Sequence, residues 1–263
     1  MDTSKKYLND YYFSLQKLCF KTAWDIKNTF ENSKIHNFRV AIKKLNAFSS
    51  FVHFIEPNFE INDKGLVEIY KAAGLLRTTA LLKKELKSIK LYNKDWKLYF
   101  RLRMKSEKIK YIKTFYQFKK EKKNEFKKEK NRVSFILVEK HGLEREADIY
   151  IKNLLTKINL HTTSNETQKS SLHDFRKLMK EFGYNYLLLS EAFYLPLDEV
   201  LMSEVNRFNK VLGKWHDKVV FKKFILKQKN YEGSERLAGQ VGIDIQKAEE
   251  FIKIEIDKFR IQG

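Results

Sequence analysis

The chain of 263 residues has little of the residue types that shape many other folds: one cysteine, two prolines and nine glycines. The single cysteine, Cys19, excludes an intramolecular disulfide and a metal site built from cysteines. So few prolines and glycines disfavour β-sandwiches and barrels, whose many turns need these residues. The sequence also has no run of 18 apolar residues, and its N-terminal residues lack the apolar region typical of a signal peptide. We therefore expect a cytoplasmic protein that is neither secreted nor inserted in a membrane.

Positive charge and aromatic residues are abundant. Lysine and arginine number 53 against 33 aspartates and glutamates, which gives a formal net charge of +20. Aromatic residues make up 14% of the chain, including 21 phenylalanines, which excludes a disordered polycation. The composition predicts an all-α protein that binds a polyanion, whether nucleic acid, acidic membrane or phosphate polymer.

The segment 101–132 carries half of the net charge, with 14 basic and 4 acidic residues (14 − 4 = +10). It is either an electrostatic binding surface for a polyanion or the solvated face of a long helix whose buried side includes Phe115, Phe118 and Phe126. Its densest part comprises Lys119, Lys120, Lys122, Lys123, Lys127, Lys128 and Lys130. Ten basic residues of the whole chain are arginines, whose planar guanidinium suits defined phosphate contacts better than lysine does.

The apolar spacing predicts helices throughout the chain. They are expected over residues 4–30, 34–55, 63–89, 94–130, 132–159, 166–194, 198–229 and 234–260. Landmarks that recur about 138 residues apart divide these helices into four and four. We therefore predict two domains, 1–130 and 131–263, that are two copies of one unit.

The clearest landmark of this repeat is the pattern His-x-x-Arg-x-x-x-Lys. It occurs first as His36, Arg39 and Lys43 (the first stripe) and again, one repeat length later, as His173, Arg176 and Lys180 (the second stripe). Pro57 and Gly74 are likewise followed at the repeat spacing by Pro196 and Gly213. Composition predicts about 0.04 such triplets in the chain, so two copies in the same order indicate a true repeat.

Each triplet lies along one side of its helix. At about 100° per residue, Arg39 falls near 300° and Lys43 near 340° from His36. The opposite side of this helix, predicted to be buried, carries Phe38, Ile42, Leu45, Phe48 and Val52. Like charges at this spacing repel by a few tenths of a kcal/mol per pair, which an anion would offset. The alternative is a solvated basic face without a ligand. A metal site is disfavoured, because neither histidine has a second ligand one turn away on its own side.

Three segments resemble the signatures of CHAD domains, the conserved histidine α-helical domain family. HNFRVAIKKLNAFSSF (36–51) is similar to the first signature helix, and LHDFRKLMKEFGYNYLLLSEAF (172–193) resembles the second. VLGKWHD (211–217) is similar to the L-G-x-x-x-D element that follows the second signature. The resemblance covers both halves. Gly183 replaces an arginine of the family pattern, and Thr78 replaces the aspartate that follows Arg77.

The resemblance implies two pseudo-symmetric antiparallel four-helix bundles around a central basic channel or groove. It also implies non-catalytic binding of inorganic polyphosphate, without a cofactor or metal, and an association with polyphosphate granules. The binding residues carried over from the family are His36, Arg39, Lys43, Lys44, Arg77, His173, Arg176 and Lys180.

Two other functions compete with this one. Nucleic-acid binding on the same basic surface is suggested by the net charge and by the tyrosines and phenylalanines of 92–126, although no known recognition motif is evident. A triphosphatase would need an E-x-E-x-K strand and a divalent metal. The nearest segment, KIEIDKF (253–259), lacks that spacing and lies in a helical pattern.

Overall fold

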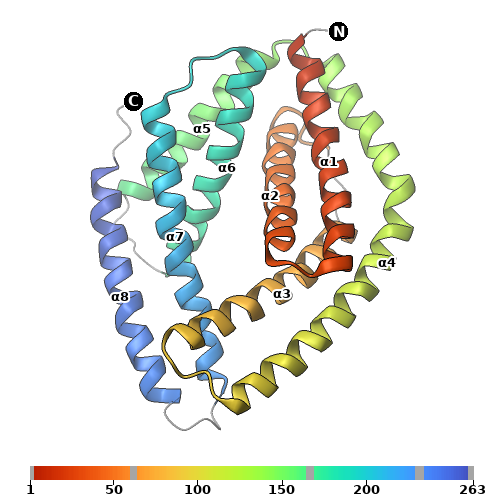
Figure 1. Cartoon of the computed structure of the whole chain (residues 1–263). Coiled ribbons are helices and arrows are strands. Elements are labelled where there is room, and N and C mark those ends of the chain that lie inside the picture. The colour runs from red at the N-terminus through yellow and green to blue at the C-terminus, as the bar shows by residue number, and fades with distance from the viewer. Residues whose placement is uncertain (1–2, 60–63, 164–168, 229–233, 260–263) are drawn as a thin grey trace. The chain divides into compact units, whose positions relative to one another are not determined.

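The computed structural model describes residues 3–59, 64–163, 169–228 and 234–259, which form helices and short connections (Figure 1). The helices are α1 (Thr3–Thr29), α2 (Asn32–Ile55), α3 (Lys64–Ser88), α4 (Lys94–Glu139), α5 (Leu143–Thr163), α6 (Lys169–Phe193), α7 (Glu199–Leu226) and α8 (Ser234–Lys258). Within these ranges the chain forms no β-strand. The predicted all-α class is confirmed.

The first compact unit, Met1–Ala147, contains a closed arrangement of four helices. In it α1 packs on α2, α2 on α3, α3 on α4, and α4 back on α1. Large aromatic side chains fill its interior, and the ring of Tyr12 lies 5.5 Å from that of Phe48. The buried Tyr111 hydroxyl of α4 donates to the backbone oxygen of Ala23 in α1 at 3.0 Å. Each such buried side chain contributes about 1.5–3 kcal/mol through the hydrophobic effect.

The second compact unit, Asp148–Gly263, contains α6 packed on α7 and α7 packed on α8. A hydrogen bond joins α5 to α6, because the Tyr150 hydroxyl donates to Glu181 at 2.8 Å. Asn185 donates in turn to the Tyr150 oxygen at 3.0 Å. Burial, with the nearby Glu181 carboxylate, raises the pKa of Tyr150, so its hydroxyl remains a donor.

The helix α4 is longer than the sequence predicts. It runs to Glu139 without a break, so the predicted helix end at residue 130 is wrong. Lysine and glutamate, which supply ten of the twelve residues 119–130, are good helix formers, and this stretch has no glycine or proline. The chain turns at Gly142, whose φ of +67° favours glycine. The predicted domain boundary after residue 130 thus falls within α4, whereas the compact units divide after Ala147.

The helices that carry the two stripes bury the sides that the sequence predicts. On α2 the side chains of Phe38, Leu45 and Phe48 are at most 1% exposed. On α6 Phe175 and Phe182 are equally buried. The basic residues lie on the other side of each helix, half-buried or exposed. Packing against the core therefore fixes the direction in which each stripe faces.

Candidate functional site

In the first unit, the structure brings together two predicted site residues from different helices. Arg77 of α3 donates from Nη1 to Nδ1 of His36 in α2 at 2.8 Å. An imidazole nitrogen that accepts from a guanidinium carries no proton, so the proton of the neutral ring lies on Nε2. His36 is exposed and Arg77 is half-buried. The pair therefore offers an imidazole and a guanidinium side by side at the surface.

Arg39, one turn after His36, is held against α3 by Tyr70. Its guanidinium donates to the backbone oxygen of Tyr70 and to the Tyr70 hydroxyl, each at 3.1 Å. It also lies over the Tyr70 ring, 4.0 Å from the centroid. Gly74 makes room for it: a Cβ at this position would lie 2.6 Å from Nη1 of Arg39. These contacts hold the guanidinium of Arg39 in one position, whereas an arginine side chain without such contacts would sample many rotamers.

The two lysines of the first predicted site are half-buried residues of α2. Helical periodicity places Lys43 next to His36 around the helix axis, within the first stripe, whereas Lys44 falls to the other side of His36. The first unit thus gathers the five predicted residues around one length of α2 and the neighbouring turn of α3.

In the second unit, the stripe of α6 faces a histidine of α7. The rings of His173 and His216 are 5.2 Å apart with an angle of 32° between their planes. Arg176 and Lys180, the other members of the second stripe, lie near enough to His216 to affect its ionisation. The three predicted residues of this unit thus lie near a histidine that the sequence analysis did not predict as part of the site.

Both of these histidines are poor bases in the absence of an anion. Burial lowers the pKa of His216 to about 4, assisted by Arg176 and His173. Burial also lowers the pKa of His173, with Lys177 and Arg176 acting in the same direction. Since both pKa values lie below the ordinary value, the pair is neutral at pH 7.

Within each unit, the residue that faces the stripe histidine occupies the same position of the repeat. His216 follows Arg77 at the same spacing that separates Gly213 from Gly74, and His173 follows His36 at nearly that spacing. In each unit the stripe histidine therefore meets the residue three positions after the repeated glycine. The repeat seen in the sequence extends to this contact between helices.

The residue that holds Arg39 differs between the halves. Asn209 is the repeat equivalent of Tyr70, since each lies four positions before the repeated glycine. The Asn209 amide donates to the backbone oxygen of Met179 at 3.4 Å. A Cβ on Gly213 would meet nothing within 4 Å, in contrast to Gly74. The contact of a guanidinium with a tyrosine ring and a glycine thus belongs to the first unit.

Gly183, which replaces an arginine of the family pattern, lies where α6 approaches α7. A Cβ there would be 3.1 Å from Cγ1 of Val205 and 3.9 Å from Nδ2 of Asn209. A long side chain at this position would push against α7, so the glycine allows the close approach of the two helices. Thr78 is half-buried, and the next residue, Thr79, is fully buried.

The lysine-rich segment lies on α4, with a buried aromatic side. Phe115 and Phe118 are at most 1% exposed, whereas Lys119, Lys120 and Lys128 are exposed. The side chains of Phe126, Lys122, Lys123, Lys127 and Lys130 lie outside the described part of the structure. The described residues fit a helix with one packed side and one solvated basic side.

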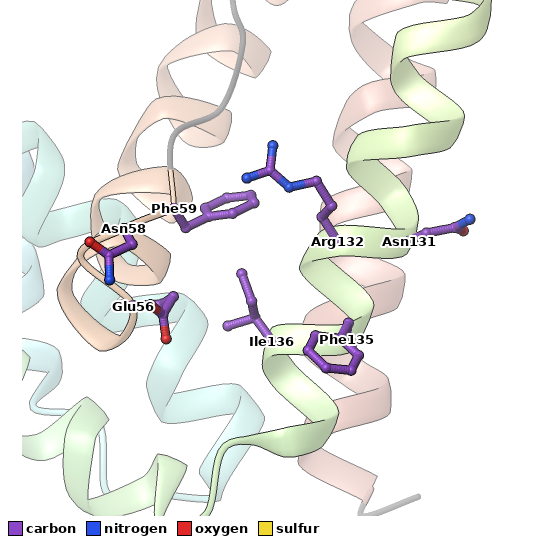
Figure 2. A pocket seen from close by; sticks show the side chains of 7 residues that line it. All are labelled: Glu56, Asn58, Phe59, Asn131, Arg132, Phe135 and Ile136. Atoms are coloured by element: carbon purple, nitrogen blue, oxygen red, sulfur yellow. The ribbon is translucent and has the colours of Figure 1, made fainter.

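A cavity of 420 Å³ opens in the first unit between the end of α2 and α4 (Figure 2). It is lined by Glu56, Asn58, Phe59, Asn131, Arg132, Phe135 and Ile136. Figure 2 shows Arg132 extending toward Phe59, and its guanidinium lies 4.9 Å from the centroid of that ring. The cavity shares no residue with the predicted site.

Membrane-spanning helices and metal clusters are both missing from the described ranges. No helix there is long and apolar enough to cross a membrane. Nor do three His, Cys, Asp or Glu side chains gather in those ranges as a metal site would require. The segment KIEIDKF, considered above for triphosphatase chemistry, is helical over Lys253–Lys258 of α8.

Two residues of the site were missed by reasoning from sequence. Tyr70 lies four and seven residues before Gly74 and Arg77, the spacing of one helix side. His216 aligns with Arg77 once the two glycines are superposed. These spacings were signals, but the role of each residue depends on a partner in another helix.

A solved structure resembles this one along the whole chain. The structure is similar to the crystal structure of the CHAD domain from the plant Ricinus communis, with a TM-score of 0.66. The match covers 100% of this chain and 90% of that chain, at 12% sequence identity.

The chain has the fold of a CHAD domain. The predicted resemblance is confirmed at the level of the fold, although no family model and no curated protein matches the sequence. The helix pairs that hold the stripes, α2 with α3 and α6 with α7, are thus parts of a CHAD fold. At such low identity, the role of each residue depends on its own surroundings in this chain.

Proposed function

We propose that this protein binds inorganic polyphosphate, without catalysis, through the two stripes and the residues that face them. The observation that carries the proposal is one contact that recurs in both units. The stripe histidine meets a basic side chain of the next helix, His36 with Arg77 and His173 with His216. Two basic side chains from separate helices meet in each unit, beside the arginine and lysine of the stripe, and such groups attract anions. A ligand with closely spaced negative charges can pair with several of these groups at once.

Polyphosphate matches this arrangement in spacing and in charge. Successive stripe residues on α2 are three and four positions apart, a rise of about 4.5–6 Å, so an extended phosphate chain can meet them in turn. Arginine supplies paired N–H donors for phosphate oxygens, and lysine adds point charge. The fixed position of Arg39 against Tyr70 lowers the conformational entropy lost on binding.

The test compares two triple variants of equal size. His36→Ala, Arg39→Ala and Lys43→Ala together should weaken polyphosphate binding far more than Lys119→Ala, Lys120→Ala and Lys128→Ala, which form the control. The control removes three charges and the stripe variant two besides the histidine, so a larger loss in the stripe variant cannot come from net charge. Because counterions are released on binding, the slope of log Kd against log salt should also fall by about 2 in the stripe variant.

Isothermal titration calorimetry with long-chain polyphosphate at several salt concentrations measures Kd, and circular dichroism confirms that each variant is folded. Equal losses in the two triple variants would mean that general charge binds the polymer and would contradict the proposed site. Failure of the wild-type chain to bind polyphosphate would contradict the function itself.

Nucleic-acid binding is the second candidate, and one feature of the first unit favours it. Trp24 of α1 and Tyr116 of α4 are 39% and 54% exposed, and the ammonium of Lys27 lies 4.3 Å and 5.7 Å from their ring centroids. Exposed rings among lysines can stack bases and attract phosphates. Displacement of bound polyphosphate by single-stranded RNA at equal charge concentration would favour this candidate over the first.

A further inference from the structure

The second unit carries an imidazole where the first carries a guanidinium. Arg77 and His216 occupy equivalent positions on α3 and α7, and each faces the stripe histidine of its own unit. The two side chains differ in one chemical respect that matters here. Arginine keeps its charge at every physiological pH, whereas histidine gains or loses its charge near neutrality.

Basic side chains from two helices lie near enough to His216 to lower its pKa. His173, Arg176 and Lys180 face it from α6, and Lys223 acts on it from its own helix, α7. An acidic neighbour of the pair is Asp174, which acts on His173 and is itself bonded to Lys177 at 2.9 Å.

Two carboxylates that reach α7 from α8 are engaged on either side of His216. Glu249 accepts from the indole nitrogen of Trp215 at 3.0 Å, and Asp244 accepts from Lys218 at 3.2 Å. The charges around the imidazole pair are therefore mostly positive. A bound anion would add the opposite charge at the place where protonation of the pair is least favoured.

We propose that His216 is an additional anion-binding residue, and that the His173–His216 pair takes up a proton when it binds phosphate groups. The second unit then binds its ligand more tightly as the pH falls, while Arg77 gives the first unit a charge that does not depend on pH. This inference rests on the polyphosphate-binding function proposed above.

The size of the effect follows from proton linkage. Burial and the neighbouring cations hold the pKa of His216 at about 4 without ligand, so it is almost wholly neutral at pH 5.5. If a bound phosphate chain restores the ordinary histidine value of about 6.5, Kd falls about tenfold between pH 7.5 and pH 5.5. The same shift corresponds to uptake of about 0.9 proton at pH 5.5. A long polymer is the right probe, because the group that titrates near neutrality, with a pKa of about 6, is the terminal phosphate.

The experiment is calorimetric titration of the full chain with long-chain polyphosphate at pH 5.5 and 7.5. Two buffers of different ionisation enthalpy give the number of protons taken up. His216→Arg and His216→Gln should each lose the proton uptake that His216 supplies, and His216→Arg should bind at least as tightly as wild type at pH 7.5. Arg77→His should add acid-dependent binding. His141→Gln, which removes an exposed histidine outside both stripes, is the matched control and should behave as wild type.

Titration of the His216 ring by NMR in the wild-type chain gives an independent reading. Its pKa should rise by about two units or more when polyphosphate is added. An unchanged His216 titration, or equal proton uptake in wild type and His216→Gln, would overturn this inference while polyphosphate binding stands. Absence of wild-type binding at both pH values would instead overturn the proposed function.

Discussion

Gly74 provides a sharp test of how Arg39 is positioned, through the substitution Gly74→Ala. Its new methyl group would lie 2.6 Å from Nη1 of Arg39, closer than real side-chain carbons approach, so the guanidinium must move. Alanine in a helix interior is itself favoured over glycine by about 0.5–1 kcal/mol. The substitution therefore combines a gain in helix propensity with the loss of the Arg39 contacts to Tyr70.

The loss can be estimated from those contacts. Two hydrogen bonds at 3.1 Å contribute about 0.5–1.5 kcal/mol each, and a cation over the half-buried Tyr70 ring adds about 0.5–1 kcal/mol. Because the guanidinium is half-buried and can bond to water after it moves, we expect a net loss of about 1–2 kcal/mol. Gly74→Ala should then leave the first unit unchanged or about 1 kcal/mol less stable.

A double-mutant cycle with Arg39→Ala isolates the contact. In the Arg39→Ala background no guanidinium opposes the methyl group, so Gly74→Ala should stabilise the unit by about 0.5–1 kcal/mol. Gly213→Ala should show the same gain in the second unit, because a Cβ there would meet nothing within 4 Å. The coupling between positions 39 and 74 is expected to be about 1–2 kcal/mol.

Urea unfolding followed by tryptophan fluorescence measures this coupling. A Trp215→Phe background restricts the signal to the first unit, which contains Trp24 and Trp96. Stabilisation by Gly74→Ala to the same extent with and without Arg39 would refute the reasoning. Polyphosphate binding should weaken severalfold in Gly74→Ala, because Arg39 would lose its fixed position.

Two further predictions concern a buried hydroxyl and a half-buried imidazole. Thr79→Val should lower the free energy of unfolding by about 1.5–3 kcal/mol, because the fully buried Thr79 hydroxyl donates to the Glu107 carboxylate at 2.8 Å. Chemical unfolding measures this loss. The control is Thr78→Val at the neighbouring half-buried position, which should stay within about 0.5 kcal/mol of wild type. Since the pKa of His216 is about 4 in the folded state and about 6.5 when unfolded, its neutral form stabilises the fold above pH 6.5, and this stability is lost as the pH falls toward 4. His216→Gln should flatten that part of the melting-temperature profile, and an unaltered profile between pH 4 and 6.5 would contradict the assignment.

Much of the local structure could be read from the sequence because its signals are local. The spacing of Phe38, Leu45 and Phe48 marked the buried side of α2, and burial of these residues is confirmed. The scarcity of glycine and proline, which the many turns of β-folds need, likewise predicted the all-α class. The end of α4 was misplaced, because a change from lysine-rich to mixed composition near residue 130 does not interrupt a helix.

The sequence alone determined that two helices carry matching stripes of histidine, arginine and lysine opposite their apolar sides, since helical periodicity depends on neighbours within one segment. The tertiary structure decided which residues of other helices contact those stripes. Tyr70 holds Arg39, and His216 faces His173, because the packing of one helix on the next sets which side chains come within reach. Such contacts join residues of separate helices that are far apart along the chain, a relation that residue spacing within a helix does not encode.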